Sequence, residues 1–339
     1  MKTGILLINL GTPDSPSKND VRKYLTEFLN DPRVIDLPTL KRWLLVNLII
    51  VPFRSAKSAR LYSKVWRNDG KSPLLYFSER QKELLQEMLG KDYKVELAMR
   101  YQSPSIADAL KKFYNPIYKK IIVFPLFPQY ASASTGSVYE KVMKTVVDWQ
   151  AFPHIEFIGS FCNDEEFIRA FSERGRKYNH AAYDHVLFSF HGLPERQILK
   201  SDMHNHCLRP GCCDSLNEKN ALCYRAQCYS TARLMAEELN IPEDKYTISF
   251  QSRLGRDPWI KPYSDEVIIE RAKAGDKKLL IFAPAFVSDC LETLYEIRVE
   301  YDELFRKHGG QKAEMVESLN ESTSWIKAMK HIALRSEHS

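Results

Sequence analysis

Short apolar runs alternate with amphipathic segments along the chain, and this alternation limits the fold more than any other feature. Helical periodicity lies between most of these runs, which cover residues 5–10, 95–99, 121–126, 155–158, 186–190, 246–250 and 279–283. Strands separated by helices form crossovers, which give parallel sheets covered by helices on both faces. Because the runs fall into two similar halves, the sequence predicts an α/β fold of two Rossmann-like domains with a cleft between them.

The two halves meet near residues 153–162. A chain of 339 residues is long enough for two domains of ordinary size. We therefore predict an N-terminal domain over residues 1–155 and a C-terminal domain over residues 156–320. We expect residues 321–339 to form a last helix that packs on the first domain.

Charge and the N-terminal residues limit the location and the partners. The balance of 49 basic and 43 acidic residues is too even to indicate nucleic acid as a partner. The apolar run in MKTGILLINLGTPDS is short and enters a glycine turn, which is typical of a first strand and not of a signal peptide. We expect a cytoplasmic protein, in which the seven cysteines are thiols or metal ligands rather than disulfides.

A histidine ends a predicted strand that is apolar on both faces. In VLFSFHGLPER the run 186–190 leads into His191, and Gly192 and Pro194 stop the strand directly afterwards. Ligands of open parallel sheets bind at the carboxyl ends of strands, and histidine titrates near neutral pH. His191 is therefore a candidate catalytic residue, with a buried histidine bonded to a backbone carbonyl as the alternative.

A second candidate is a column of acidic residues. Their spacings of three, four, four and three residues place them on one face of a predicted α-helix, and they are Asp289, Glu292, Glu296, Glu300 and Glu303. Crowded carboxylates can relay protons or hold a cation, although a solvated acidic face is the common alternative. The column begins where the strand 279–283 ends, which places Glu292 near the same sheet edge as His191.

Residues 37–53, LPTLKRWLLVNLIIVPF, form the longest apolar segment. The run from Trp43 to Phe53 is too short to span a bilayer as a helix, which takes about 20 residues. Two interpretations remain open. The segment is either a core helix or an exposed lip that guards a pocket or rests on a membrane.

Six motifs, in this order, resemble ferrochelatase over nearly the entire chain: GILLINLGTPDS, SPLLYFSERQ, LFPQYASASTGS, FSFHGLPER, FQSRLGRDPW and DCLETLYEI. The resemblance implies a two-lobed, chelatase-like α/β fold. It also implies a lyase that inserts Fe²⁺ into protoporphyrin IX with release of two protons, the final step of haem biosynthesis. Ferrous iron and protoporphyrin IX would then be the substrates.

The resemblance also assigns roles to residues near the predicted sheet edge. In the family pattern FSFHGLP carries the essential histidine, here His191, and DCLETL carries the essential glutamate, here Glu292. Both are assigned to iron binding and proton abstraction, and Glu296 would join Glu292 on a route for protons or iron. Whether His191 acts as a base or as the first iron ligand stays open.

The family's porphyrin contacts fall in the N-terminal half. The resemblance favours the exposed lip for residues 37–53, and we expect an exposed lip to make peripheral contact with the inner membrane surface. The contacts carried over to this chain are Arg54, Tyr62 and Ser72, with Arg100 and Tyr101 lining the pocket. The spacing between Tyr62 and Ser72 differs from that in animal members.

Five cysteines lie within 22 residues: Cys207, Cys212, Cys213, Cys223 and Cys228. This segment, residues 200–228, resembles the internal cluster segment of certain bacterial ferrochelatases, which implies a [2Fe-2S] cluster held by four of the five. Thiolate ligation of iron and sulfide accounts for such a density of cysteines. Zinc fits the spacing in part, and unliganded thiols are the third alternative.

Two other functions stay open. A haem or tetrapyrrole carrier would keep the porphyrin pocket but would not need a base that faces an acidic column. A chelatase for another metal, or for coproporphyrin, would need both the pocket and the base. The sequence predicts no oligomeric state.

Overall fold

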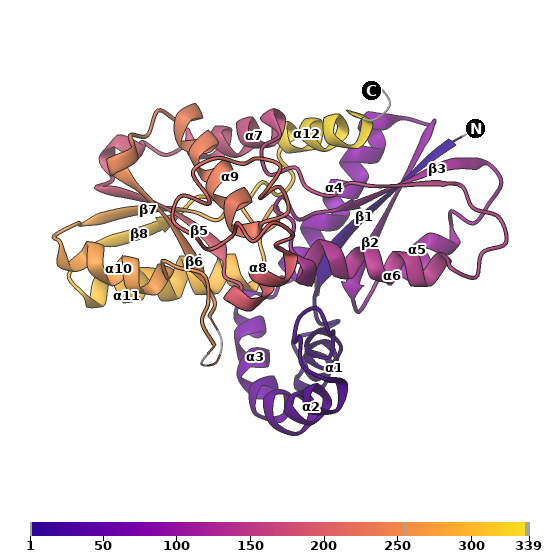
Figure 1. Cartoon of the computed structure of the whole chain (residues 1–339), viewed down its shortest axis with the longest axis horizontal. Helices are drawn as coiled ribbons and strands as arrows, with labels where there is room; N and C mark the ends of the chain where they lie inside the picture. The colour runs from indigo at the N-terminus through magenta and orange to yellow at the C-terminus, as the bar shows by residue number, and fades with distance from the viewer. Residues whose placement is uncertain (1, 254, 256, 336–339) are drawn as a thin grey trace. The chain divides into compact units, whose positions relative to one another are not determined.

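The computed structural model describes residues 2–253, 255 and 257–335, which pack as two units (Figure 1). The first unit comprises Met1–Phe127, Ser132–Gly159 and Met329–Ser339, and the second comprises Pro128–Ala131 and Ser160–Ala328. The bounds predicted from the sequence, 1–155, 156–320 and 321–339, stay predictions, as does the cleft.

A parallel sheet forms the centre of the first unit. Its strand order is β2-β1-β3-β4 in the part of the chain that the structure describes, and its strands are β1 (Lys2–Gly11), β2 (Tyr93–Tyr101), β3 (Tyr118–Pro125) and β4 (His154–Phe157). Helices α5 (Ile106–Lys111) and α6 (Ser137–Val146) pack on one face against Leu6 and Ile8. Helix α4 (Pro73–Leu89) covers the other face (Figure 1).

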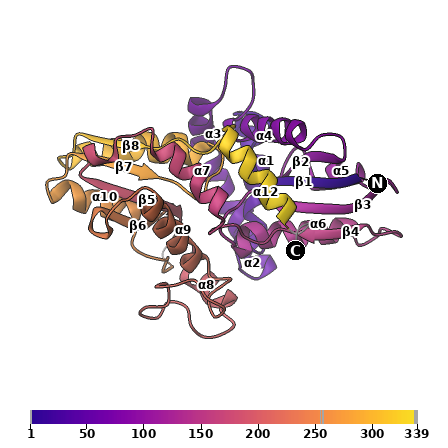
Figure 2. The ribbon, with the colours of Figure 1, turned by 90° about the horizontal axis from the view of Figure 1, so that it is seen from above.

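The second unit repeats this arrangement. Its sheet has the order β6-β5-β7-β8, and its parallel strands are β5 (His185–His191), β6 (Tyr246–Gln251), β7 (Lys278–Phe282) and β8 (Lys312–Met315). One face packs on α10 (Ser264–Lys273), the π-helix η5 (Glu292–Tyr301) and α11 (Asp302–Lys307). Figure 2 shows α7 (Glu165–Gly175) and α9 (Tyr224–Glu238) over the other face.

The two sheets confirm the predicted α/β fold of two Rossmann-like parallel sheets flanked by helices. The seven predicted runs all became strands. The sequence did not predict β8, because Lys312 and Glu314 interrupt its four residues. This strand lies at an edge of its sheet, where polar side chains face solvent.

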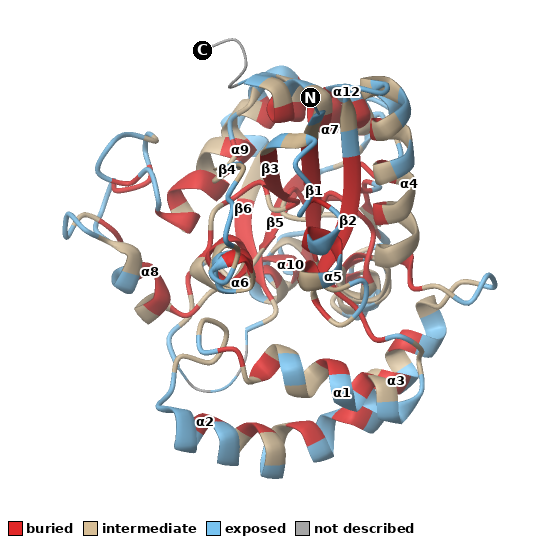
Figure 3. Ribbon diagram, turned by 90° about the vertical axis from the view of Figure 1, so that its right-hand side faces the viewer, coloured by how far each residue is buried: buried red, intermediate tan, exposed pale blue. Residues whose placement is uncertain are grey.

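The apolar segment 37–53 forms the start of a long helical stretch in the first unit. Its parts are α2 (Thr39–Leu44), the π-helix η1 (Leu45–Ile50) and α3 (Val51–Val65), and these pack on α1 (Lys18–Leu29). Val46 is fully buried, whereas Leu40 and Phe53 are 70% and 79% exposed. Figure 3 shows exposed positions along α2 and α3. The segment is therefore exposed along much of its length and is not a core helix, and its role as a lip stays a prediction. No helix within the described residues is long and apolar enough to cross a membrane.

The remaining elements are short connections, apart from the last helix. Helix α8 (Glu195–Ser201) precedes an irregular segment, residues 202–223, that carries most of the clustered cysteines and extends away from the sheet (Figure 2). The others are η2 (Ser132–Gly136), η3 (His180–Ala182), η4 (Glu243–Lys245) and α12 (Thr323–Leu334).

Gly11, at the end of β1, is required by its own sheet. Its φ of +116° lies in the left-handed region, and a Cβ on it would stand 2.1 Å from the carbonyl oxygen of Tyr101 on β2. The sequence predicts a glycine turn at this point. In the structure, the neighbour that needs this space is the adjacent strand.

His185, the first residue of β5, gives the fold a pH dependence. Its ring is buried, with Nε2 2.8 Å from Oγ1 of Thr247, and burial lowers its pKa from 6.5 to about 4. Between these pH values the unfolded chain binds a proton that the folded protein does not. The free energy of unfolding should therefore fall by about 3 kcal/mol as the pH is lowered through this range, and no further below it.

Urea unfolding at several pH values, from about pH 4 to 7, measures this effect. The matched variant is His185→Gln, which keeps a polar side chain but has no titrating ring. The variant should lack this component of the pH dependence. Equal pH dependence in the variant and the wild type would contradict the assignment.

Candidate active site

His191 lies at the carboxyl end of β5, between β6 and β7. Its partner on β6 is Gln251, the last residue of that strand. The ring nitrogen Nδ1 lies 2.7 Å from the carbonyl oxygen of Gly192. Because a carbonyl oxygen accepts and does not donate, Nδ1 carries the proton and Nε2 keeps its lone pair. The half-buried ring thus has one nitrogen able to accept a proton or to bind a metal.

The turn after His191 needs a glycine. The amide of Gly192 donates to the carbonyl oxygen of Gln251 at 2.8 Å. A Cβ on Gly192 would lie 2.8 Å from that same oxygen and 3.2 Å from the ring of Trp259. Neither the backbone of β6 nor a packed indole can yield easily, so this close approach fixes where β5 ends.

The acidic column differs from the prediction in helix type. Residues 292–301 form a π-helix, in which hydrogen bonds join residues five apart, and not the α-helix that the spacing predicts. Asp289 is buried and accepts hydrogen bonds from Thr293 Oγ1 at 2.9 Å and from Asn320 Nδ2 at 2.8 Å. It closes the start of the helix and is no member of an open column. Glu300 and Glu303 are exposed, so Glu292 and Glu296 remain as half-buried carboxylates.

A contact with the end of β6 places Glu296 at the sheet edge that carries His191, and Glu292 lies four residues before it on η5. Ser252 directly follows β6, and its hydroxyl donates to Glu296 Oε2 at 2.7 Å. Glu292 accepts a hydrogen bond from the thiol of Cys290, whose pKa is raised by burial so that it stays protonated. The ends of β5 and β6 and the carboxylate of Glu296 thus lie at one edge of the sheet, whereas the catalytic roles of His191, Glu292 and Glu296 stay predictions.

Tyr224, at the start of α9, is a contact of His191 that the sequence analysis missed. Its hydroxyl donates to the carbonyl oxygen of His191 at 2.8 Å. Complete burial raises the pKa of Tyr224 well above its usual value, so the hydroxyl stays a donor. No local signal marks this residue, because it lies 33 positions from His191.

Four of the five clustered cysteines form one group, which we call the cysteine group: Cys207, Cys212, Cys213 and Cys223. The sulfur atoms of Cys212 and Cys213 lie 3.6 Å apart. A hydrogen bond from Cys213 lowers the pKa of the Cys223 thiol, and Cys207 also donates to Cys223. Cys228 is fully buried on α9, where its thiol contacts the hydroxyl of Tyr224 instead.

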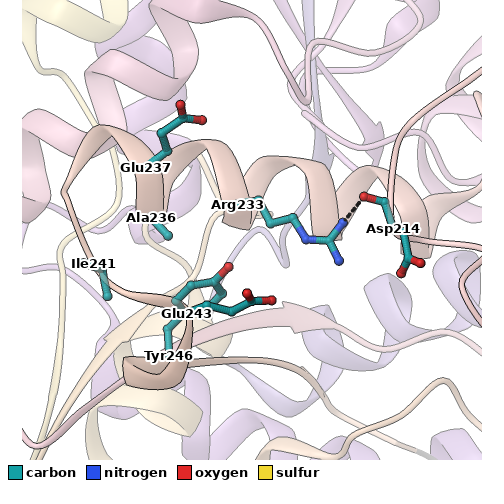
Figure 4. Close-up of a pocket in the computed structure, with 7 residues that line it drawn as sticks. All are labelled: Asp214, Arg233, Ala236, Glu237, Ile241, Glu243 and Tyr246. Atoms are coloured by element: carbon teal, nitrogen blue, oxygen red, sulfur yellow. Dashed lines mark hydrogen bonds between the residues drawn. The ribbon is translucent and has the colours of Figure 1, made fainter.

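Two arginines of α9 hold the cysteine group. Arg225 Nη1 donates to Cys213 Sγ at 3.2 Å, and Arg233 Nη1 donates to the carbonyl oxygens of Cys213 and Asp214, each at 2.6 Å. Figure 4 shows Arg233 reaching Asp214 across an open pocket of about 520 Å³. Within the described residues, no three His, Cys, Asp or Glu side chains are arranged as a site for a single metal ion.

Arg100 and Tyr101, at the end of β2, share one buried carboxylate in the first unit. Asp31 Oδ2 accepts from Arg100 Nη2 at 2.6 Å, from Tyr101 Oη at 2.9 Å and from Ser137 Oγ at 2.6 Å. Burial raises the pKa of Tyr101, which keeps its hydroxyl protonated. The charge of Arg100 is therefore balanced within the protein, which the sequence analysis did not predict because it did not single out Asp31.

The other predicted porphyrin contacts lie on α3 and at the start of α4. Ser72 is buried and caps α4, accepting a hydrogen bond from the amide of Leu75 at 3.2 Å. Tyr62 is largely buried, edge-on to Tyr24. Arg54 is exposed. Polar contacts within the protein thus already engage Ser72, Arg100 and Tyr101.

Residues 2–337 match the family Ferrochelatase. The chain belongs to the ferrochelatase family. A ferrochelatase of Legionella pneumophila (strain Lens) is 45% identical over 332 residues, which are 98% of each chain. A ferrochelatase of Coxiella burnetii (strain Dugway 5J108-111) is 44% identical over 337 residues, 99% of this chain and 94% of that one.

Solved structures that resemble this ferrochelatase family member support its fold. SirB from Bacillus subtilis with Fe³⁺ matches with a TM-score of 0.57 at 14% identity, over 100% of this chain and 98% of that chain. A second SirB, a sirohydrochlorin chelatase from Bacillus subtilis subspecies spizizenii in complex with cobalt, gives 0.51 at 11% identity, with the same coverage. Family membership confirms the predicted enzyme class, a porphyrin metal chelatase for the final step of haem biosynthesis.

Asp31 should matter far more than an exposed carboxylate that forms an ion pair. Replacing Asp31 by Ala would leave Arg100 charged and largely buried, with a side chain that is 14% exposed. We expect Asp31→Ala to lower the free energy of unfolding by about 3–5 kcal/mol, measured by urea unfolding.

The matched control is Glu83→Ala, which removes the exposed partner of Arg80 on α4. An exposed pair of this kind contributes about 1 kcal/mol or less, so the control should unfold almost like the wild type. Similar losses in the two variants would show that Asp31 does not have the predicted role.

Proposed function

We propose that this chain inserts Fe²⁺ into protoporphyrin IX through His191, Glu292 and Glu296 at the carboxyl edge of the second sheet. The observation that carries the proposal is the tautomer of His191. Its Nδ1 is held by the Gly192 carbonyl, so that Nε2 presents a lone pair. Two half-buried carboxylates reach the same edge from η5.

Proton balance explains why one base is not enough. Metal insertion replaces two pyrrole N–H protons by Fe²⁺, and both protons must leave the ring. The Nε2 atom of His191, with its free lone pair, can take only one proton at a time. A second acceptor is needed to pass protons on, and the carboxylates of Glu292 and Glu296 supply it. The hydroxyl of Ser252 holds Glu296 at the sheet edge.

The same groups suit iron in transit. Imidazole and carboxylate are ordinary ligands of iron, and a site with one of each type binds it less tightly than a site with several imidazoles or thiolates. Weak binding is an advantage here, because the metal must leave the protein for the porphyrin. His191 therefore serves as the first proton acceptor or the first iron ligand, and either role requires the free Nε2 lone pair.

Substitution of His191 or Glu292 tests the catalytic assignment. We expect His191→Ala and Glu292→Gln each to lower the rate of iron insertion by about 10²–10⁴-fold, because each loses a group that handles protons or metal. Binding of protoporphyrin, followed by fluorescence quenching, should change little. The measurement is the rate of haem formation without oxygen.

The control is His308→Ala. His308 has the same bonding pattern as His191, with Nδ1 2.9 Å from the carbonyl oxygen of Leu304, but it lies at the end of α11. This variant should keep the wild-type rate. A wild-type protein that binds protoporphyrin but forms no haem would instead favour the tetrapyrrole carrier. Faster insertion of cobalt or nickel would favour another chelatase.

We also propose porphyrin contacts in the first unit. Arg54 is exposed on α3, and its guanidinium suits a propionate of the substrate. Tyr62, Ser72, Arg100 and Tyr101 would line the pocket, where their bonds within the protein fix their positions. The exposed apolar side chains of residues 40–53 suit a large apolar macrocycle.

We further propose that the cysteine group holds a [2Fe-2S] cluster. Such a cluster takes four thiolates, two on each iron, and the structure brings four of the five candidate cysteines together while Cys228 bonds to Tyr224. The guanidinium of Arg225 beside Cys213 offsets the negative charge of thiolate ligands. The residues therefore fit the group. When bound, the cluster would supply a redox-active cross-link within this segment.

Cysteine substitutions test the ligand set. Protein purified without oxygen should contain about two iron and two sulfide per chain and show charge-transfer absorption. Serine at position 207, 212, 213 or 223 should abolish both, whereas Cys228→Ser should retain them, because Cys228 lies outside the group. Zinc without sulfide would contradict the cluster, and equal loss in Cys228→Ser would contradict the ligand assignment.

The location is the last part of the proposal. The exposed apolar side chains of α2 and η1, next to Lys41, suit shallow insertion into a membrane surface with anionic lipids. We propose a cytoplasmic protein that contacts the inner membrane peripherally through this lip.

A further inference from the structure

The carbonyl oxygen of His191 takes its hydrogen bond from a side chain and not from the sheet. The ladder between β5 and β7 ends where Phe188 faces Phe282, three residues before the end of β5. Beyond this point the hydroxyl of Tyr224 donates to His191 O at 2.8 Å. A side chain of α9 thus completes the bonding of the strand end that carries the candidate catalytic histidine.

The peptide group between His191 and Gly192 is held on both sides, and the bond from Tyr224 holds its carbonyl side. The amide of Gly192 belongs to the same planar peptide as the His191 carbonyl, and it donates to Gln251 O at 2.8 Å. Tyr224 and β6 therefore hold this peptide between them. The next carbonyl, that of Gly192, accepts the proton of the His191 ring at 2.7 Å. The orientation of the held peptide thus sets the position and the tautomer of the imidazole.

The same turn of α9 is tied to the cysteine group. Cys223 directly precedes Tyr224, and Arg225, which directly follows it, donates to Cys213 Sγ at 3.2 Å. Asn220 adds a second tie, because its carbonyl accepts from the amide of Cys223 and its Nδ2 donates to the carbonyl of Cys212, each at 2.8 Å. Both neighbours of Tyr224 therefore contact the cysteine group.

We propose that Tyr224 is a positioning residue for His191 and that it transmits the state of the cysteine group to the rate of metal insertion. With the four thiolates bound to their metal group, the first turn of α9 is fixed and the hydroxyl reaches His191. Without that group, the turn is released and the bond is lost. The inference rests on the proposed roles of His191 and of the cysteine group, and it makes the rate depend on whether the chain itself has received iron.

The bond can be observed directly by nuclear magnetic resonance. The sequence contains two His–Gly pairs, His191–Gly192 and His308–Gly309. Protein labelled with ¹³C at histidine carbonyls and ¹⁵N at glycine amides should therefore give two carbonyl–amide cross-peaks. One reports the carbonyl that Tyr224 contacts, and the other is an internal control. His191→Gln assigns the peaks by removing the first.

Tyr224→Phe is compared with its parent protein twice, once with the cysteine group loaded and once with it emptied. Because metal content is equal within each comparison, any difference reports the Tyr224 hydrogen bond. With the cysteine group loaded, Tyr224→Phe should shift the His191 carbonyl peak and leave the His308 peak in place. With the group emptied by Cys207→Ser, adding Tyr224→Phe should change neither peak, because the bond is already lost. A loaded Tyr224→Phe variant with an unshifted peak overturns the proposal. The proposal is also overturned if adding Tyr224→Phe to Cys207→Ser shifts the His191 carbonyl peak by the same amount as in the loaded protein.

Kinetics on the same variants give a second readout. Tyr224→Phe keeps the ring, so iron and sulfide content should match the wild type, and the free energy of unfolding should fall by no more than the loss of one buried hydrogen bond. Its kcat should fall about tenfold, the value of one hydrogen bond, with KM for protoporphyrin unchanged. Cys207→Ser and the double variant should show the same kcat as Tyr224→Phe. If the losses of kcat from Cys207→Ser and Tyr224→Phe multiply in the double variant, the proposed coupling is overturned. Cys212→Ser replaces Cys207→Ser if that variant does not fold.

The control variant is Tyr229→Phe. Its hydroxyl accepts from Arg225 Nη2 at 3.0 Å and so also lies beside the cysteine group, but it does not contact His191. It should keep the wild-type kcat, and a tenfold loss there overturns the specific role of Tyr224. A failure of the proposed catalytic function gives a result different from a failure of this inference. His191→Ala with a normal rate removes the proposed role of His191, whereas an inactive His191→Ala beside a normal Tyr224→Phe overturns this inference alone.

Discussion

The parallel pairing of β5 with β6 on one side and β7 on the other is the constraint on which the candidate site depends. Parallel strands end at one edge of their sheet, so His191, Ser252 and the segment that leads to η5 emerge together. A shift of one residue in the register of β5 would turn its side chains to the opposite face. The buried residues of this strand, above all Phe188 and Phe190, fix the register and thereby the place of His191.

The sequence predicted what local patterns determine. Apolar runs identified seven strands, since a strand that is buried on both faces must be apolar throughout. Strand ends then placed His191 and Glu292 at one edge without knowledge of any contact. The strand β8 was not predicted, because Lys312 and Glu314 break the apolar pattern at an exposed edge of the sheet. The helix type of η5 was predicted wrongly, because acidic residues spaced three and four apart do not distinguish an α-helix from a π-helix.

Bonds between distant residues could not be predicted. Asp31 lies 69 residues from Arg100 in the chain, yet it determines whether that arginine is a free cation or half of an ion pair. Tyr224 and Ser72 look in the sequence like an ordinary helix residue and a candidate ligand contact. Their actual partners, the carbonyl of His191 and the amide of Leu75, follow from tertiary packing and capping. Spacing also could not separate Cys228 from the other four cysteines.

The division of the chain into units has a consequence for synthesis on the ribosome. Residues 128–131 belong to the second unit, where Gln129 Nε2 donates to Thr231 Oγ1 at 3.0 Å, while the described residues from Met329 onward belong to the first. Neither unit is one continuous piece of chain. The first unit therefore lacks the segment that begins at Met329 until the whole second unit has been synthesised, so an N-terminal domain cannot complete its fold before the next one is made.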